Sequence, residues 1–268
     1  MEKKLKRKSA LFLALLTGIL VCGCDKNNAS QALANYSEET AVTEKMSETV
    51  VTTTIIESEN ETEDDEDTTE KKETKISLED FKSKLVVVGD SIAYGYAAYE
   101  RLPMNHVFAQ QGVNLSSIRD EVFSSDYGDD YVLNIISNMK PEYIMLSMGM
   151  NEIGNRRYED FAEKYKELAE DFHKASPESI IYVAGMTPVG SEAENDLIDN
   201  ENINKHNEML EKSFNGENNI YYVNIGKILE TESGNLNEEY SGGDGIHLKG
   251  DAYDLLIDEL LEFVNNNI

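Results

Sequence analysis

Cysteine is nearly absent from this chain, which has only two in 268 residues, Cys22 and Cys24. Everything that follows them therefore lacks a disulfide framework, a thiolate metal site and a cysteine nucleophile. Tryptophan is missing altogether, although 14 tyrosines, 8 phenylalanines and a 40% share of apolar residues are sufficient for a hydrophobic core. The sequence therefore predicts a globular body that folds by burying apolar surface rather than by cross-linking.

Positive charge is also scarce. The chain has 24 Lys and Arg residues and 52 Asp and Glu residues, which gives a net charge of −28. Such a body is repelled by phosphate backbones and anionic head groups, which excludes nucleic acids as partners. A P-loop and a dinucleotide-binding fingerprint are both missing, so we expect no cofactor. None of His106, His173 and His206 has a partner at metal-ligand spacing, so we expect no catalytic metal.

The N-terminal residues have the order of a processing signal. Five basic residues lie between positions 3 and 8, and an apolar stretch from Ala10 to Val21 follows. That stretch is too short to span a ~30 Å hydrocarbon core comfortably. It ends in Val21-Cys22-Gly23-Cys24, which resembles the lipobox of bacterial lipoproteins.

This resemblance implies that residues 1–23 are a signal peptide and that Cys24 is lipidated. The mature protein would then be anchored by its lipid on the extracellular face of the bacterial cell membrane, with no other membrane contact. The alternative is an ordinary signal peptide in which both cysteines are incidental.

Residues 24–80 have the composition of a spacer. They are rich in Glu, Thr, Ser, Asn and Asp, contain no Gly or Pro, and include an acidic run at 61–67. Self-repulsion and scarce apolar residues predict an extended, disordered tether. The acidic run lacks the spacing and the glycine of an EF-hand loop, so a solvated spacer is favoured over a calcium site.

The remaining segment, residues 81–268, has the pattern of one α/β domain. Short apolar runs, typical of buried strands, lie at 85–88, 107–110, 143–147, 180–184 and 220–225. Between and after them, apolar residues recur at helical spacing over 161–172, 203–214 and 253–264. This alternation predicts βαβ units and one five-stranded parallel sheet covered by helices on both faces.

Polar residues typical of acyl transfer follow these strands. Ser91 comes after the first strand, Gly112 after the second, Asn151 after the third, and Asp244 and His247 precede the last helix. Ligands of parallel sheets bind outside the carboxyl ends of the strands, so we expect these residues to meet there.

Each of these residues has a role in the chemistry of ester cleavage. His247 would take the proton of the Ser91 hydroxyl, while Asp244 would orient the imidazole and stabilise its charged form. The backbone N–H groups of Ser91 and Gly112 and the Asn151 amide would form an oxyanion hole. Taken singly, Ser91 could be a helix cap, Gly112 a turn and Asn151 a loop amide, but their joint order favours catalysis.

The segments GDSIAYG, QQGVN, GMNE and DGIHL that carry these residues resemble the GDSL/SGNH hydrolase family, over residues 85–265. The resemblance implies a flavodoxin-like three-layer α/β/α sandwich. It also implies Ser91, Asp244 and His247 as the catalytic triad, and Ser91, Gly112 and Asn151 as the oxyanion hole. One departure is Glu152, which stands where the family pattern G-x-N-D has its Asp.

The expected activity is that of a surface-anchored serine esterase acting on small acyl esters, mainly acetyl, of carbohydrates. Its partner would be a small acyl ester or an acylated glycan, for which Tyr94, Tyr96 and Tyr99 could provide a sugar platform. One alternative is an O-acyltransferase that uses the same residues. A second is a catalytically inactive carbohydrate-binding module, against which the intact Ser, Asp and His set argues.

Overall fold

The computed structural model of the protein describes residues 75–267. The predictions of a signal peptide, of lipidation at Cys24 and of a tether up to residue 74 lie outside these residues. The first element, helix α2 (Leu78–Lys84), is capped by Ser77, whose hydroxyl accepts the N–H of Asp80. The folded part therefore starts a few residues before the boundary expected at residue 81.

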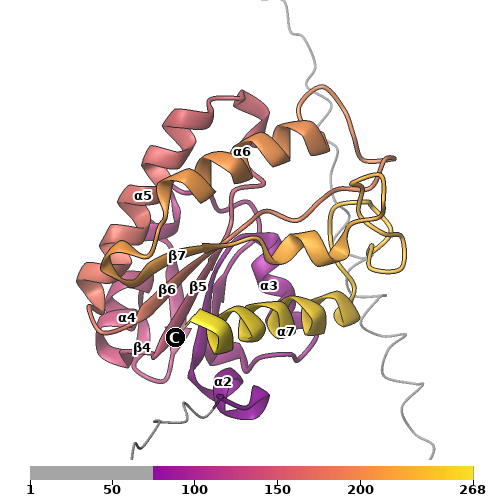
Figure 1. Cartoon of the computed structure of the whole chain (residues 1–268). Coiled ribbons are helices and arrows are strands. Elements are labelled where there is room, and N and C mark those ends of the chain that lie inside the picture. The colour runs from indigo at the N-terminus through magenta and orange to yellow at the C-terminus, as the bar shows by residue number, and fades with distance from the viewer. Residues whose placement is uncertain (1–74, 268) are drawn as a thin grey trace, which may run out of the picture. The chain divides into compact units, whose positions relative to one another are not determined.

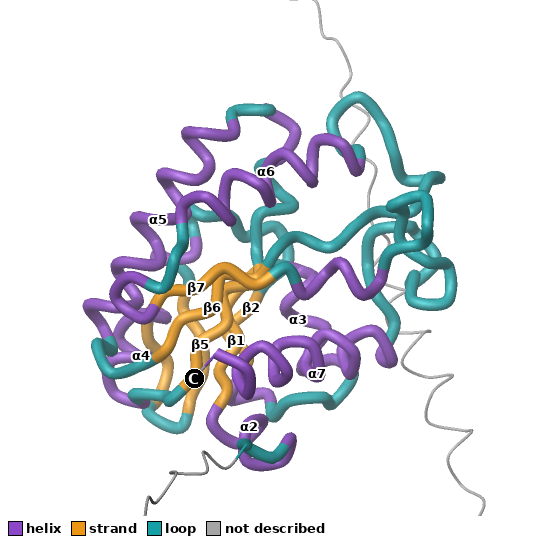
Figure 2. The backbone as a smooth tube through the Cα atoms, in the orientation of Figure 1, coloured by secondary structure: helices purple, strands orange, loops and turns teal. Residues whose placement is uncertain are grey.

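Five parallel strands form the central sheet, as predicted from the apolar runs. They are β1 (Leu85–Gly89), β2 (Val107–Ala109), β5 (Tyr143–Ser147), β6 (Ile180–Ala184) and β7 (Ile220–Val223). Their order across the sheet is β2-β1-β5-β6-β7, with β1 paired to both β2 and β5. Figure 1 labels β5, β6 and β7, and Figure 2 also labels β1 and β2. This order reverses direction at β1, and such a switch point is where open parallel sheets bind ligands.

Helices cover both faces of the sheet, which confirms the three-layer α/β sandwich (Figure 2). Alternate strand residues point to opposite faces, so Val86 and Val88 join one core and Leu85 and Val87 the other. The first core includes α4 (Val132–Met139), α5 (Tyr158–Ala175) and α6 (Asn200–Ser213). The second includes α2, α3 (Ser91–Ala98) and α7 (Gly250–Asn267).

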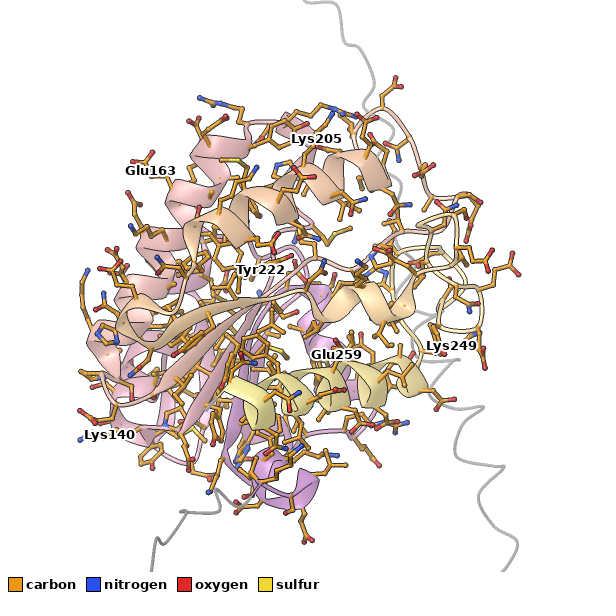
Figure 3. The ribbon with its side chains drawn as sticks, in the orientation of Figure 1. Lys140, Glu163, Lys205, Tyr222, Lys249 and Glu259 are labelled. Atoms are coloured by element: carbon orange, nitrogen blue, oxygen red, sulfur yellow. The ribbon has the colours of Figure 1, made fainter. Side chains whose placement is uncertain are left out.

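The helices bury the faces expected from their apolar spacing. On α5 the buried side chains are Phe161, Ala162, Tyr165, Leu168, Ala169 and Phe172. Charged residues occupy the outer faces, where Glu163 of α5 and Lys205 of α6 point away from the sheet (Figure 3). None of the helices within residues 75–267 is long and apolar enough to cross a membrane.

Helices α2 and α4 and an antiparallel ribbon were not expected from the sequence. Strands β3 (Val122–Ser125) and β4 (Gly128–Tyr131) form an antiparallel ribbon beside the main sheet, and Phe123 packs edge-on against Phe108 of β2. The connections also contain short 3₁₀ helices: η1 (Met104–His106), η2 (Ile118–Asp120), η3 (Ile153–Asn155), η4 (Glu217–Asn219) and η5 (Ile225–Leu229).

Candidate active site

Three of the predicted site segments leave the sheet at the same level. Gly89, the last residue of β1, is in register with Ala109 of β2 and with Ser147 of β5. A side chain at Gly89 would clash, because its Cβ would lie 1.8 Å from the carbonyl oxygen of Ser147. The missing side chain lets the strands stay paired up to the point where the loops with Ser91, Gly112 and Asn151 begin.

Ser91 is the first residue of α3, so its backbone N–H lies at the positive end of the helix dipole. The preceding residue, Asp90, caps the helix by accepting the N–H of Ile92 at 3.0 Å. Its other carboxylate oxygen accepts the N–H of Gly149 at 3.2 Å, which connects the Ser91 turn to the loop after β5. Burial raises the pKa of Asp90 to about 6, although these backbone N–H groups favour the ionised form.

Ser91, His247 and Asp244 form one continuous chain of hydrogen bonds. The distance from Ser91 Oγ to His247 Nε2 is 3.0 Å, and the distance from His247 Nδ1 to Asp244 Oδ2 is 2.6 Å. With the Nδ1–H donating to the carboxylate, Nε2 remains an acceptor for the serine hydroxyl. The structure thus brings together three residues that the sequence places 156 positions apart at most.

The Asp244 carboxylate is held in place by its own loop. Its Oδ1 accepts the N–H groups of Ile246 at 2.9 Å and His247 at 2.8 Å, while Oδ2 faces the imidazole. Partial burial alone would raise the pKa of Asp244, but the hydrogen bonds from the His247 ring and these two N–H groups lower it below its ordinary value. Asp244 is therefore ionised over the whole neutral range and able to stabilise an imidazolium.

A hydrogen bond joins the loop that carries Gly112 to the loop that carries Asn151. The Asn151 amide donates to the carbonyl oxygen of Val113 at 2.7 Å, which leaves its second N–H for another acceptor. Gly112 has a φ of +78°, a conformation that suits glycine. Within residues 75–267, the backbone N–H groups of Ser91 and Gly112 have no acceptor.

The carboxyl group of Glu152 reaches into the same loop. Its Oε1 accepts the N–H of Leu115 at 2.6 Å, while its Oε2 is buried without a hydrogen-bond partner among the described residues. Burial raises the pKa of Glu152 to about 7, and the charge of Asp90 adds to this rise. The backbone N–H of Leu115 and the charge of Lys164 act in the opposite direction.

The loop that carries Asp244 and His247 is supported by residues that sequence reasoning missed. Ser241 is buried, and its hydroxyl accepts the N–H groups of Gly243 at 3.1 Å and Gly245 at 3.3 Å. The N–H of Gly190, after β6, donates to the Gly245 carbonyl at 2.7 Å. The triad loop therefore rests on the loop between β6 and α6.

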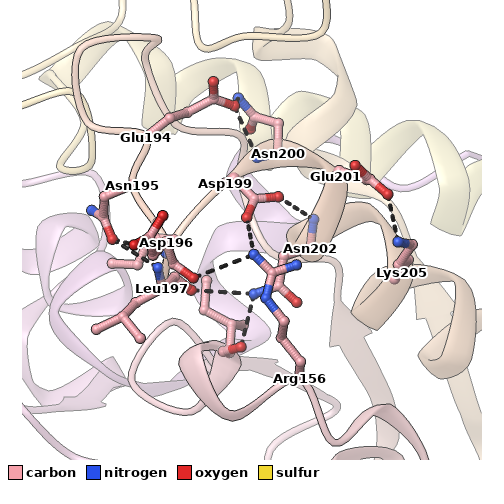
Figure 4. Close-up of polar contacts among 12 residues, drawn as sticks. Arg156, Glu194, Asn195, Asp196, Leu197, Asp199, Asn200, Glu201, Asn202 and Lys205 are labelled. Atoms are coloured by element: carbon pink, nitrogen blue, oxygen red, sulfur yellow. Dashed lines mark hydrogen bonds and ion pairs between the residues drawn. The ribbon is translucent and has the colours of Figure 1, made fainter.

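That supporting loop is held by asparagines at the start of α6. The Asn200 side chain pairs with both backbone groups of Val189, at 2.9 Å and 2.8 Å. It also donates to the Glu194 carboxylate, as Figure 4 shows. Asp199 caps α6 through the N–H of Asn202 and forms an ion pair with Arg156. Of the four asparagines at 200, 202, 204 and 207, all but Asn204 are buried. Such a run was a signal for side-chain-to-backbone bonds, since Asn pairs with both N–H and C=O groups.

The three tyrosines after Ser91 separate into two groups. Tyr94 and Tyr99 are both 40% exposed, whereas Tyr96 is fully buried against the edge of Tyr253. The expected role of Tyr96 in a sugar platform is therefore wrong, because its ring belongs to the core between α3 and α7. Among the described residues, no group of three or more His, Cys, Asp or Glu side chains could hold a metal ion.

The buried carboxyl group of Glu152 predicts a change of stability with pH. In the unfolded chain this group ionises near its ordinary pKa, whereas in the folded protein it holds its proton up to about pH 7. The folded state binds more protons between these values, so the stability contributed by the group is complete below pH ~4 and is lost as pH rises through 7. Glu152→Gln should therefore gain a few degrees in Tm relative to wild type between pH 5 and pH 8.

Thermal melts of both proteins at several pH values measure this effect. His206, whose pKa is lowered by burial, titrates in both proteins and cancels in the difference. A Tm difference that stays constant from pH 5 to pH 8 would contradict the assignment of a protonated, buried Glu152.

Comparison with known proteins places this architecture in a family. The sequence model of the GDSL-like lipase/acylhydrolase family matches residues 87–255. No curated protein matches the chain at significant similarity.

Solved structures share the fold. A candidate acylhydrolase from Bacteroides fragilis superposes with a TM-score of 0.51 at 19% identity, covering 68% of this chain and 86% of that one. A GDSL-like lipase from Bacteroides thetaiotaomicron has a TM-score of 0.51 at 17% identity, covering 70% of this chain and 90% of that one. At such low identity these structures show a common fold and nothing further.

Proposed function

Because the chain belongs to the GDSL-like lipase/acylhydrolase family, we propose that it is a serine esterase that removes small acyl groups, above all acetyl, from carbohydrates. The observation that carries the proposal is the unbroken hydrogen-bond chain from Asp244 through His247 to Ser91. A helix cap or a surface histidine would not need the two ring nitrogens to be bound in this order.

The proposed reaction follows from these contacts. His247 Nε2 takes the Ser91 proton as Oγ attacks the ester carbonyl, and Asp244 stabilises the resulting imidazolium. The carbonyl oxygen becomes an oxyanion. It accepts hydrogen bonds from the backbone N–H groups of Ser91 and Gly112 and from the second N–H of the Asn151 amide. The imidazolium then protonates the departing alcohol, and a water molecule activated by His247 releases the acid from Ser91.

One feature supports a sugar as the alcohol part of the substrate. Tyr94 lies three residues after Ser91 on α3 and exposes 40% of its surface. An exposed tyrosine ring one helical turn from a nucleophile suits the apolar face of a sugar ring.

Release of acid from defined esters tests this proposal. The full-length protein would be incubated with p-nitrophenyl acetate, butyrate and octanoate and with acetylated polysaccharides, and then with a fluorophosphonate probe. The proposal expects acetate release, a preference for the shortest ester and labelling of Ser91. Absence of both hydrolysis and labelling would overturn it in favour of a carbohydrate-binding module.

An O-acyltransferase would use the same side chains, because only the acceptor of the acyl group differs. The two activities separate when a free sugar is added to the reaction. A hydrolase releases acetate in the presence of the sugar, whereas a transferase forms the acetylated sugar at the expense of acetate.

Anchoring of the mature protein at Cys24 on the extracellular face of the cell membrane is part of the proposal, and it rests on the order of residues before Cys24. Cys24→Ser should move the protein from the membrane fraction to the medium or to the unprocessed precursor. Fractionation of expressing bacteria measures the change, with Cys22→Ser as the matched control that should remain in the membrane fraction. Equal fractionation of wild type and Cys24→Ser would show that this thiol carries no lipid.

A further inference from the structure

We propose that Glu152 is a positioning residue for the oxyanion hole. Together with Asn151 it holds the backbone of residues 113–115, and through this segment it sets the place of the Gly112 N–H. The inference deepens the proposed esterase function and rests on it, because it assigns a second residue to the support of the same oxyanion.

Two hydrogen bonds join the loop after β5 to the loop after β2. Asn151 donates to the carbonyl oxygen of Val113 at 2.7 Å, and Glu152 accepts the N–H of Leu115 at 2.6 Å. Two consecutive residues of the loop after β5 thus bind a donor and an acceptor, two residues apart, in the loop after β2. Two such bonds restrain both the separation and the rotation of the loops, which a single bond would not do.

Gly112 depends on these two bonds because the turn that contains it is closed by a long hydrogen bond, from the Val113 N–H to the Gln110 carbonyl at 3.4 Å. A Cβ at Gly112 would meet no atom within 4 Å, so no side chain packs against this residue from its Cβ side. By contrast, Val113 is 2% exposed and Leu115 is 1% exposed, so both are fixed in the core. The position of the Gly112 N–H is therefore set by residues 113–115, which Glu152 and Asn151 hold in place.

The loop on each side of this segment is also closed. The Asn114 side chain accepts the N–H groups of Ser116 and Ser117, each at 3.0 Å, which forms a compact turn after Leu115. The backbone N–H of Glu152 donates a hydrogen bond to the Gly149 carbonyl at 3.0 Å. Gly149 in turn donates to Asp90, the residue next to Ser91. One connected network therefore links Glu152 to both backbone donors of the oxyanion hole.

Glu152 occupies this place at an energetic disadvantage. One of its carboxyl oxygens is buried without a hydrogen-bond partner among residues 75–267, and burial of an unpaired polar atom destabilises the fold. A leucine or methionine would fill the same space without that cost, but neither could accept the N–H of Leu115. The bond to the loop is what the carboxyl group contributes.

Kinetics of the full-length protein with p-nitrophenyl acetate test the proposal. Glu152→Ala should lower kcat about 10- to 100-fold with little change in KM, because a misplaced donor weakens the transition state more than the bound ester. Glu152→Gln should keep kcat within a few-fold of wild type, since its amide oxygen still accepts the Leu115 N–H. Glu152→Asp, one methylene shorter, should fall between them.

The matched control is Glu142→Ala, at the opposite end of β5, where the carboxylate is half-exposed and paired with Lys84. It should leave kcat unchanged. Hydrogen exchange provides a second readout that needs no activity, since peptides covering 110–117 should exchange faster in Glu152→Ala than in Glu152→Gln.

Equal kcat and equal exchange in Glu152→Ala and wild type would overturn the positioning role while leaving the esterase proposal intact. If Glu152→Ala does not fold, the comparison of Glu152→Gln with Glu152→Asp decides: equal kcat in these two would also overturn it. Faster exchange over 110–117 without any wild-type hydrolysis would overturn the esterase proposal and with it the catalytic part of this inference.

Discussion

Replacement of Ser91 by alanine is expected to lower kcat for an acetyl ester by about 10⁴- to 10⁶-fold. The variant keeps the backbone N–H at the start of α3 and the cap supplied by Asp90, so it loses the nucleophilic oxygen and little else. Ser91 is only partly buried, and its removal leaves no large cavity. We therefore expect a Tm close to that of wild type together with a nearly complete loss of hydrolysis.

The measurement is initial rates with p-nitrophenyl acetate, together with labelling by a fluorophosphonate probe. His247→Ala should cause a loss of similar size, and the double variant should be no worse than either single one, because the two residues act as a unit. Ser91→Ala with a rate within tenfold of wild type would show that another group attacks the ester.

Asn151→Ala should lower kcat by about 10²- to 10³-fold, which corresponds to about 2.7–4 kcal/mol of transition-state stabilisation. Its amide has one N–H bound to the Val113 carbonyl and a second N–H that points to no acceptor among residues 75–267. The bound hydrogen fixes the direction of the amide, and the other one is available to the oxyanion. Because a neutral ester carbonyl gains little from this donor, KM should change much less than kcat.

Steady-state kinetics and thermal melts separate this role from a structural one. Loss of the Val113 bond alone should cost about 1 kcal/mol of stability, which is small beside the loss in rate. Asn151→Asp is the sharper control, because its carboxylate has no N–H for Val113 or for the oxyanion and repels the developing charge. A variant that melts far below wild type but retains kcat would show that Asn151 serves only the fold.

Much of the architecture followed from local patterns. The largely apolar runs at 85–88, 143–147 and 180–184 predicted strands buried on both faces, and all three lie inside the sheet. Apolar residues at helical spacing predicted the buried face of α5. Both predictions hold because the periodicity of a strand or helix decides which side chains share a face. That face packs against the core whichever elements cover it.

The sequence patterns did not predict the ribbon of β3 and β4, because its side chains are only partly buried. Its residues are exposed or half-buried, and Asp129 and Asp130 interrupt any apolar pattern in β4. Such a ribbon is stabilised by packing of Phe123 on Phe108, a contact between side chains 15 positions apart that no local pattern reports.

For the site, the sequence by itself determined the residue types and their order: a serine, a glycine, an asparagine and an Asp/His pair, at the ends of strands and before the last helix. Only the tertiary structure decided which groups support them. The bond from Leu115 to Glu152 needs the loops after β2 and β5 to meet at one edge of the sheet. The bonds of Asn200 with Val189 need the start of α6 to fold back on the loop after β6, and the burial of Tyr96 needs α3 to pack on α7. Hydrogen bonds of this kind act over about 3 Å, so they exist only once packing has brought distant segments to that distance.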